Sequence, residues 1–491
     1  MSSAALLPAR SKARTPAGER ALSALAALHL SFLPWAFGGV DLWSQVTSLA
    51  LAGAMLTLAL LRRDDSVPAD GENSPGEGAW ARLRTFPVFW AGLGLMGFVV
   101  VQALNPAFHY RQEGTIWWLV RGEHVAWLPA GMDAPLAGNP WRVLLVWGSC
   151  WLTVCALWTG VKRRSSVLLI LTVVCTNAAL FAVFGLLQRA GGITAIYTNR
   201  SVALSYFFAA LIYKHHVAAY FSLLAFVALG LAIRALRHTW HEPKPSGIFC
   251  IYLLGVVLLS TAVLVSFSFS GIMIFGVVLL GLAAALLGRR LRTTGPPRVL
   301  GPAMIAATIA VTAVVALAGA VGAGDFREKL HQQWQGDGRD AVNTRLQAYH
   351  RGWEMFQDRW ISGWGAGCFV YGFTKYQRRE PELARTRYAA LRWEHVHNDW
   401  LELLIELGVV GCLPIAVMAW FWVRRLVDLQ IWRDPSLLAV GAGIGALVLH
   451  ALVDFPAQCP AVLVTAGALL PLIVRWAESP TRRASPEPRC F

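Results

Sequence analysis

The chain has 491 residues, of which 56% are hydrophobic and only 14% are charged, and its formal net charge is +15. Soluble proteins carry about 25% charged residues, so this composition excludes a soluble protein and indicates a membrane protein. The positive charge does not indicate nucleic-acid binding, because most basic residues fall in short gaps between apolar runs. We therefore expect membrane lipids as partners and no nucleic acid.

Apolar runs along the chain predict about twelve transmembrane helices, since a helix of about 20 apolar residues crosses a bilayer. The runs lie at 22–40, 44–61, 86–104, 141–161, 166–187, 213–233, 247–266, 270–288, 300–322, 400–423, 436–454 and 459–475. This pattern predicts an all-α polytopic membrane protein with one large helical loop on the outer side. Its expected parts are an N-terminal tail at 1–21, about nine helices within 22–322, the loop at 323–397, about three helices within 398–475 and a C-terminal tail at 476–491.

Basic clusters predict the orientation of the chain in the membrane. A cluster follows every even-numbered apolar run, as Lys162, Arg163 and Arg164 do after the fourth and Arg424 and Arg425 after the tenth. Cytoplasmic loops carry the excess of Lys and Arg in membrane proteins. We therefore expect both termini in the cytoplasm, and the large loop on the opposite face.

The large outer loop is itself rich in cations, which the same rule does not predict. It holds twelve Lys and Arg residues between Gly324 and Glu394. The simple interpretation is the solvated surface of amphipathic helices. The functional alternative is that some of these cations, Arg345 in particular, bind a phosphate or diphosphate at the membrane face.

The sequence His395-Val396-His397-Asn398-Asp399 suggests two kinds of site. Two His around one residue can bind zinc, but a zinc site needs a further cluster of ligands, and the outer loop has only His331 and His350 besides. We therefore predict no metal site.

Helical periodicity gives the alternative interpretation of this segment. His395, Asp399, Glu402 and Glu406 follow one another at the spacing of a single helical stripe. Acids inside a membrane span are costly and usually face a polar cavity. Glu402 and Glu406 are therefore expected to point inward, with His397 at the cavity mouth as a candidate general base. The alternative is a capping His beside structural acids.

The run Gly363-Trp364-Gly365-Ala366-Gly367 resembles a nucleotide-binding loop only superficially. It lacks the preceding strand and the following Lys-Ser/Thr of such loops. We interpret it as a tight turn between two surface helices, the first of which is predicted at 345–360.

Three stretches resemble the O-antigen ligase and O-antigen polymerase superfamily of bacterial polytopic glycosyltransferases. One runs from Arg345 to Phe369 through the Gly-rich run, and a second is His397-Asn398-Asp399-Trp400-Leu401-Glu402 with Glu406, Gly408 and Gly411. The third and weaker stretch is Phe184–Gln188 with His216–Tyr220. The resemblance covers roughly residues 184–456 and implies a GT-C-like fold in the bacterial inner membrane with a periplasmic active face.

The resemblance implies a glycan transfer that inverts the anomeric carbon and needs no metal or other cofactor. The donor is a glycan on undecaprenyl diphosphate, and the acceptor hydroxyl belongs to lipid A-core or to another glycan. By this resemblance His397 is the catalytic base, and the substrate-binding residues are Arg345, Arg200, Lys214, Arg392, Asn398 and Glu402.

Other functions stay open at this point. An O-antigen or exopolysaccharide polymerase and a protein O-oligosaccharyltransferase use the same donor chemistry as a ligase, which we favour mildly. A transporter of lipid-linked glycans needs charges along its mid-membrane helices, and here the exceptions are His450 and Asp454, which we interpret as an inward-facing structural pair. A structural membrane protein leaves the outer cations unexplained.

Overall fold

The structure is a computed structural model of the 491-residue chain. It describes residues 15–61, 78–193, 195–196, 200–201, 207–239, 247–292, 338–380, 383 and 393–478. The structure is 76% helical and agrees with the predicted all-α polytopic membrane fold. The expected ninth run at 300–322 and both terminal tails beyond these ranges lie outside the described residues.

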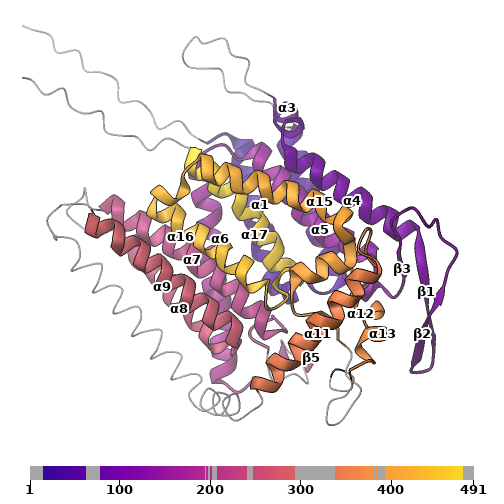
Figure 1. The fold of residues 1–491 in the computed structure, drawn as a ribbon. Helices are drawn as coiled ribbons and strands as arrows, with labels where there is room; N and C mark the ends of the chain where they lie inside the picture. Colours follow the sequence, from indigo (N-terminus) through magenta and orange to yellow (C-terminus); the bar gives the residue numbers. More distant parts are fainter. Residues whose placement is uncertain are drawn as a thin grey trace, which may run out of the picture.

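Long helices form the body of the molecule (Figure 1). They are α1 (Ala17–Trp35), α2 (Leu42–Leu61), α4 (Pro87–Leu104), α5 (Pro140–Gly160), α6 (Arg164–Ala190), α7 (Lys214–Thr239), α8 (Gly247–Val265), α9 (Phe269–Arg292), α15 (Asp399–Asp428), α16 (Pro435–His450) and α17 (Pro460–Glu478). Among the described residues nine of these helices are long and apolar enough to cross a membrane, namely all except α1 and α16.

The two remaining helices occupy predicted spans but end early. Helix α1 ends at Trp35 and is followed by the 3-10 turn Phe37–Gly39, whereas the run was expected to continue to residue 40. Helix α16 has 16 residues and ends at His450. Residues 451–454 continue as hydrogen-bonded turns. The total of twelve spans therefore stays a prediction.

A small sheet, which the apolar runs do not predict, covers part of the loop end of the bundle. Strands β1 (Pro106–Glu113) and β2 (Ile116–Arg121) form an antiparallel hairpin, and β3 (Gly131–Asp133) pairs with β1 in parallel. A second pair consists of β4 (Ala195–Ile196) and β5 (Arg200–Ser201). In Figure 1 the hairpin lies at the edge of the molecule next to α12 (Phe369–Gly372) and α13 (Thr374–Gln377).

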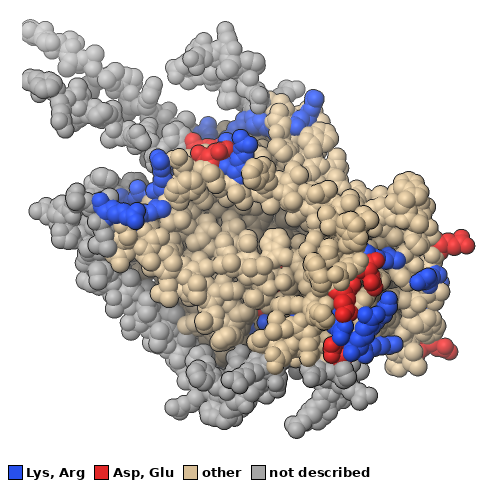
Figure 2. Space-filling model, viewed as in Figure 1, with Lys and Arg blue, Asp and Glu red and all other residues tan. Residues whose placement is uncertain are grey.

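The large loop has a hydrophobic core of its own. Helix α11 (Gly338–Asp358) contributes Ala348 and Met355, which are buried together with Trp364 and Phe369. Its outer side carries ion pairs, such as the one in which Arg351 lies 2.6 Å from Glu380. Figure 2 shows these charges gathered over α11–α13, separated by an uncharged band from the basic residues at the other end of the helices. Arg351 therefore pairs with acids of the loop itself, Glu354 and Glu380.

Helix α15 is broken at Gly408, and the Gly-rich run fills the break. Gly408 has φ 63° and ψ −176°, a conformation open essentially to glycine alone. The carbonyls of Ile405 and Glu406 accept hydrogen bonds from the backbone N–H groups of Trp364 and Gly365 at 2.9 and 3.0 Å.

The second half of the break is satisfied in the same way. The N–H groups of Val409 and Val410 donate to the carbonyls of Trp360 and Ile361 at 2.8 and 3.0 Å. A Cβ atom on Gly363 would lie 2.2 Å from the carbonyl oxygen of Glu406, so this approach requires glycine. The run 363–367 lies between the helices α11 and α12, as predicted, and it also supplies hydrogen bonds to a broken membrane helix, which the sequence did not predict.

Candidate active site

The carboxylate of Asp454 is the centre of the site. Asp454 follows α16, is fully buried, and has its Oδ2 atom 2.6 Å from Nδ1 of His215 and 3.2 Å from the hydroxyl oxygen of Ser270. Its other oxygen, Oδ1, lies 3.1 Å from Nδ1 of His397. Side chains from three other parts of the chain thus converge on one carboxylate. His450 is buried beside Asp454, as predicted, and its carbonyl accepts a hydrogen bond from the Asp454 N–H at 3.0 Å.

Arg345 adds a permanent positive charge to this centre. Its Nη2 atom lies 3.6 Å from Oδ2 of Asp454, and its Nη1 donates a hydrogen bond to the carbonyl of Val453 at 3.3 Å. Lys214, the first residue of α7, interacts electrostatically with both Arg345 and Asp454. We refer to Asp454, His397, His215, Arg345 and Lys214 as the Asp454 centre.

His397 is held in an unusual backbone conformation that turns its side chain toward Asp454. Its φ is 60°, in the left-handed region that non-glycine residues seldom adopt. The hydroxyl of Tyr349 donates to its carbonyl oxygen at 2.7 Å, and its ring packs against those of Trp393 and Phe455. Such a conformation is found where the surrounding structure enforces it, often at functional sites.

The bond to Asp454 determines which ring nitrogen of His397 can act as a base. A carboxylate accepts hydrogen bonds, so Nδ1 carries the proton that it donates to Asp454. The neutral ring then has its lone pair on Nε2, as in the His-Asp pairs of hydrolases. Burial alone would raise the pKa of Asp454, but the hydrogen bonds from His215 and His397 and the charge of Arg345 hold it well below its usual range. Asp454 is therefore ionised at neutral pH.

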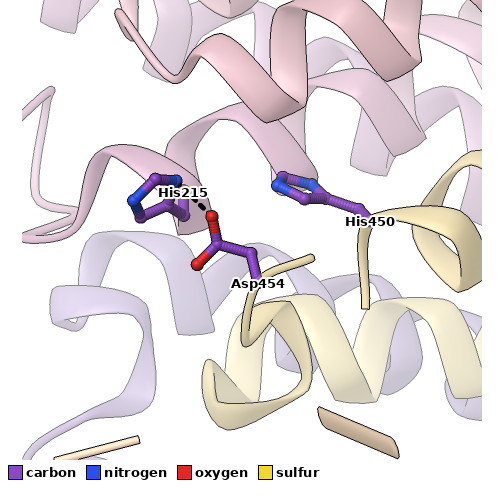
Figure 3. Close-up of side chains that lie close together, drawn as sticks. All are labelled: His215, His450 and Asp454. Carbon is purple, nitrogen blue, oxygen red and sulfur yellow. Dashed lines mark ion pairs between the residues drawn. The ribbon is translucent and has the colours of Figure 1, made fainter. Parts of the chain in front are cut away.

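His215, His450 and Asp454 lie close enough together to raise the question of a metal site (Figure 3). One ligand atom from each falls within 4.8 Å of the others. Two ligands of one tetrahedral zinc ion are separated by about 3.3 Å, whereas His215 and Asp454 are joined at 2.6 Å. Arg345 also places a cation next to the same carboxylate oxygen. This arrangement fits a hydrogen-bonded network in which His215 and Asp454 share a proton.

A second pair of histidine and carboxylate lies two residues away from His397. Nδ1 of His395 lies 2.7 Å from Oε1 of Glu402, whose carboxylate also accepts from the Val396 N–H at 2.9 Å and the Gln458 amide at 3.2 Å. Burial would lower the pKa of His395, but the charge and hydrogen bond of Glu402 raise it to about 9. His395 is therefore a cation at neutral pH, and with Glu402 it forms what we call the Glu402 pair.

The predicted helical stripe is wrong at its first member. Helix α15 begins at Asp399, and the side chain of Asn398 caps it by accepting a hydrogen bond from the Leu401 N–H at 3.1 Å. His395 therefore precedes the helix and reaches Glu402 through the loop. Glu402 and Glu406 are buried, with 2% and 4% of their surface exposed, as the stripe predicted for them.

Phe455 stands between the Asp454 centre and the Glu402 pair. Its ring stacks on His395 with 4.6 Å between centroids, and His397 meets it edge-on at 4.8 Å. On the His395 side opens a cavity of about 380 Å³. Its polar lining includes Arg142, Tyr213, Glu394, His395, Glu402 and Glu406. The sequence predicted His397 at the mouth of the cavity that Glu402 faces. In the structure Glu402 lines this cavity, but His397 does not.

The predicted site residues have different outcomes. His397, Arg345 and Lys214 come together around Asp454, Asn398 is a helix cap, and Glu402 lines the cavity. The backbone of Arg200 lies in β5, but its side chain and all of Arg392 lie outside the described residues. Sequence reasoning missed the roles of His215 and Asp454. A buried acid at the end of an apolar run was the available signal for Asp454.

The comparison with known protein families points to the same segment. Residues 254–416 match a family described as O-antigen ligase. The matched segment contains Arg345, His397 and Glu402, whereas Lys214, His215 and Asp454 lie outside it. No curated protein matches the chain at a significant level.

Proposed function

The O-antigen ligase domain at residues 254–416 supports an O-antigen ligase or polymerase type of membrane glycosyltransferase at the family level, and we propose the reaction as follows. The protein transfers a glycan from an undecaprenyl-diphosphate carrier to an acceptor hydroxyl at the periplasmic face of the inner membrane. The favoured acceptor is lipid A-core, which makes the protein an O-antigen ligase. The observation that carries this proposal is that Asp454 contacts both His397 and Arg345.

The chemistry needs a base on the acceptor and a cation on the leaving group. Nε2 of His397 takes the proton of the acceptor hydroxyl while that oxygen attacks the anomeric carbon of the donor. The bond from this carbon to the diphosphate oxygen breaks, and the electron pair leaves with the diphosphate. One displacement inverts the anomeric configuration. General-base assistance of this kind contributes about 10²–10⁴-fold to a rate.

The charges around Asp454 have separate tasks in this reaction. Arg345 and Lys214 offset the negative charge that develops on the diphosphate, a role for which a preorganised cation is effective. Ionised Asp454 stabilises the imidazolium that forms on His397 and fixes its tautomer. Each task falls to a side chain of this chain, so the step is written without a metal.

The test uses cells from which the gene is deleted, complemented with wild type or with His397→Ala. Surface polysaccharide and carrier-linked glycan are separated on gels. If the deleted gene encodes a ligase, full-length polymer stays on the carrier and none appears on lipid A-core. If it encodes a polymerase, lipid A-core carries only single repeat units.

We expect His397→Ala to behave like the deletion, with transfer reduced by at least about 10²-fold, because the base is lost. Membrane levels and the thermal midpoint of the variant serve as folding controls. Full transfer by this variant contradicts the assignment of His397, and an unchanged glycan pattern in the deletion strain contradicts the proposed reaction.

A further inference from the structure

We infer that the cavity beside the Glu402 pair is the binding site for a sugar ring of the acceptor glycan. This inference rests on the proposed glycan transfer and names a subsite for its second substrate. The cavity has a volume of about 380 Å³, at the small end of the range of about 300–1,000 Å³ for small-molecule sites. It therefore suits a short part of a glycan rather than a whole chain.

The lining offers both partners that sugar hydroxyls require. Glu406 is 4% exposed, and its carboxyl group accepts hydrogen bonds from the backbone N–H groups of Gly367 and Phe369, the second at 3.1 Å. A carboxylate has room for about four hydrogen bonds, so capacity is left for a hydroxyl donor. Glu394 accepts from the Tyr213 hydroxyl at 2.8 Å and adds a second carboxylate.

Arg142 supplies hydrogen-bond donors to the same lining. Its Nη2 donates to the carbonyl of Val40, and its Nε donates to Oε1 of Gln45 at 3.2 Å, which fixes the guanidinium in place. A guanidinium has five N–H donors in a rigid fork, of which these bonds use only some. The rings of Trp147 and Tyr371 add flat apolar surface to the same cavity.

The charge of the lining favours the acceptor over the diphosphate end of the donor. The lining sets the acids Glu394, Glu402 and Glu406 against two cations, Arg142 and His395, and His395 is already paired with Glu402. It therefore lacks the excess of positive charge that would hold a diphosphate. Arg345 and Lys214, the cations of the Asp454 centre, do not belong to the lining. The cations proposed for the leaving group therefore lie outside the cavity.

Phe455 connects the cavity to the proposed base. Its ring touches His395 and Tyr213 on the cavity side and His397 at the Asp454 centre. A sugar held in the cavity could thus extend a hydroxyl past the edge of Phe455 toward His397. In a displacement that inverts the anomeric carbon, the acceptor must approach from the side opposite the leaving group, so the acceptor needs a binding site separate from Arg345 and Lys214, as this cavity is.

The experiment uses purified full-length protein in vesicles of phosphatidylethanolamine and phosphatidylglycerol. The probes are lipid A-core and undecaprenyl-diphosphate-linked glycan, both extracted from the deletion strain. Val146→Phe fills the cavity without removing a polar group, and Arg142→Gln removes a donor. Leu145→Phe is the matched control, because Leu145 directly precedes Val146 on the same helix but does not line the cavity.

We expect Val146→Phe and Arg142→Gln to raise the KM for lipid A-core by about 10-fold or more. Val146→Phe takes up room that the sugar ring needs, and Arg142→Gln removes a hydrogen-bond donor, each at a cost of about 1–2 kcal/mol. The KM for the donor and the kcat should change by less than about twofold, and Leu145→Phe should resemble wild type. A raised KM for the donor would assign the cavity to the donor glycan, and unchanged values for both substrates would show that it binds neither. Either outcome overturns the inference.

A second readout does not depend on turnover. Ala457→Cys places a thiol in the lining, in a background where Cys250 and Cys490 are replaced by Ser. Lipid A-core, but not the carrier-linked glycan, should slow labelling of this thiol by a maleimide in both active protein and the His397→Ala variant. Protection in a wild-type protein that shows no transfer contradicts only the proposed chemistry. Transfer without protection contradicts only the cavity inference.

Discussion

The Asp454 centre and the Glu402 pair are built from the same two groups, a histidine and a buried carboxylate, yet they differ in what else touches the carboxylate. Glu402 accepts hydrogen bonds from the imidazole of His395, the backbone N–H of Val396 and the side-chain amide of Gln458. Asp454 is shared by two histidines and an arginine. The first arrangement fixes a loop onto a helix. The second gathers ionisable groups that can exchange a proton and bind an anion.

The backbone explains how two histidines in one tripeptide serve different carboxylates. His397 has φ 60°, so its side chain leaves the direction that His395 follows. Val396 between them is fully buried in the loop core and anchors the segment. The alternation His-Val-His thus separates two chemical environments on either side of Phe455.

The largest expected effect is a loss of kcat on replacing Asp454 by its amide, with the same change at Glu402 as the comparison. Asp454→Asn should lower kcat by about 10²–10⁴-fold, because Asn can present the wrong partner to Nδ1 of His397 and does not stabilise its charged form. Glu402→Gln should lower kcat far less, since Glu402 does not contact the base. The measurement is transfer in vesicles with saturating donor and acceptor. Equal losses in the two variants would contradict the separation of the two regions.

A smaller effect is expected on stability, and it should be clear in the Glu402 variant. Glu402→Gln leaves the positive charge of His395 without its partner, and we expect a loss of about 1–3 kcal/mol in the free energy of unfolding. Thermal unfolding of the detergent-solubilised protein measures it. The double variant His395→Gln with Glu402→Gln should recover part of the loss. A midpoint equal to wild type in the single variant would mean that the pair is not a stabilising contact.

The smallest effect is a pH dependence of stability. The pKa of His395 is raised to about 9 in the folded protein from an ordinary value of 6.5. A raised pKa means that the charged form is stabilised by folding, so this stability is fully present below about pH 6.5 and is lost as pH rises through about 9. Thermal midpoints between pH 6 and pH 10 should therefore fall more in wild type than in His395→Gln. Parallel curves for the two proteins would contradict the assignment of this charge.

The sequence predicts the membrane helices well, because each depends on a local run of apolar residues. The runs at 44–61 and 86–104, for example, correspond to α2 and α4 within a few residues. Helix ends are harder to predict, as α16 shows, because capping and turns at a membrane surface depend on neighbouring helices.

The site is only partly predictable, because its contacts join distant parts of the chain. His397 and Arg345 were identified by motif and resemblance, whereas Asp454 lies 57 residues beyond His397 in sequence. The two meet because the Asp399 N–H at the start of α15 bonds to the carbonyls of Ala451 and Asp454 in the turn after α16. The stripe that began at His395 failed because periodicity does not reveal where a helix starts. Asn398 gave that signal, since Asn is a preferred N-cap residue.

The break in α15 determines how substrates can reach the site. The backbone groups around Gly408 have their hydrogen-bond partners in residues 360–365 of the large loop. If the loop lifted away, these groups would face lipid unpaired, at a cost of several kcal/mol each. Residues 360–365 are therefore fixed to the broken helix. If the donor is lipid-linked, as proposed, we expect it to enter from the bilayer, between helices.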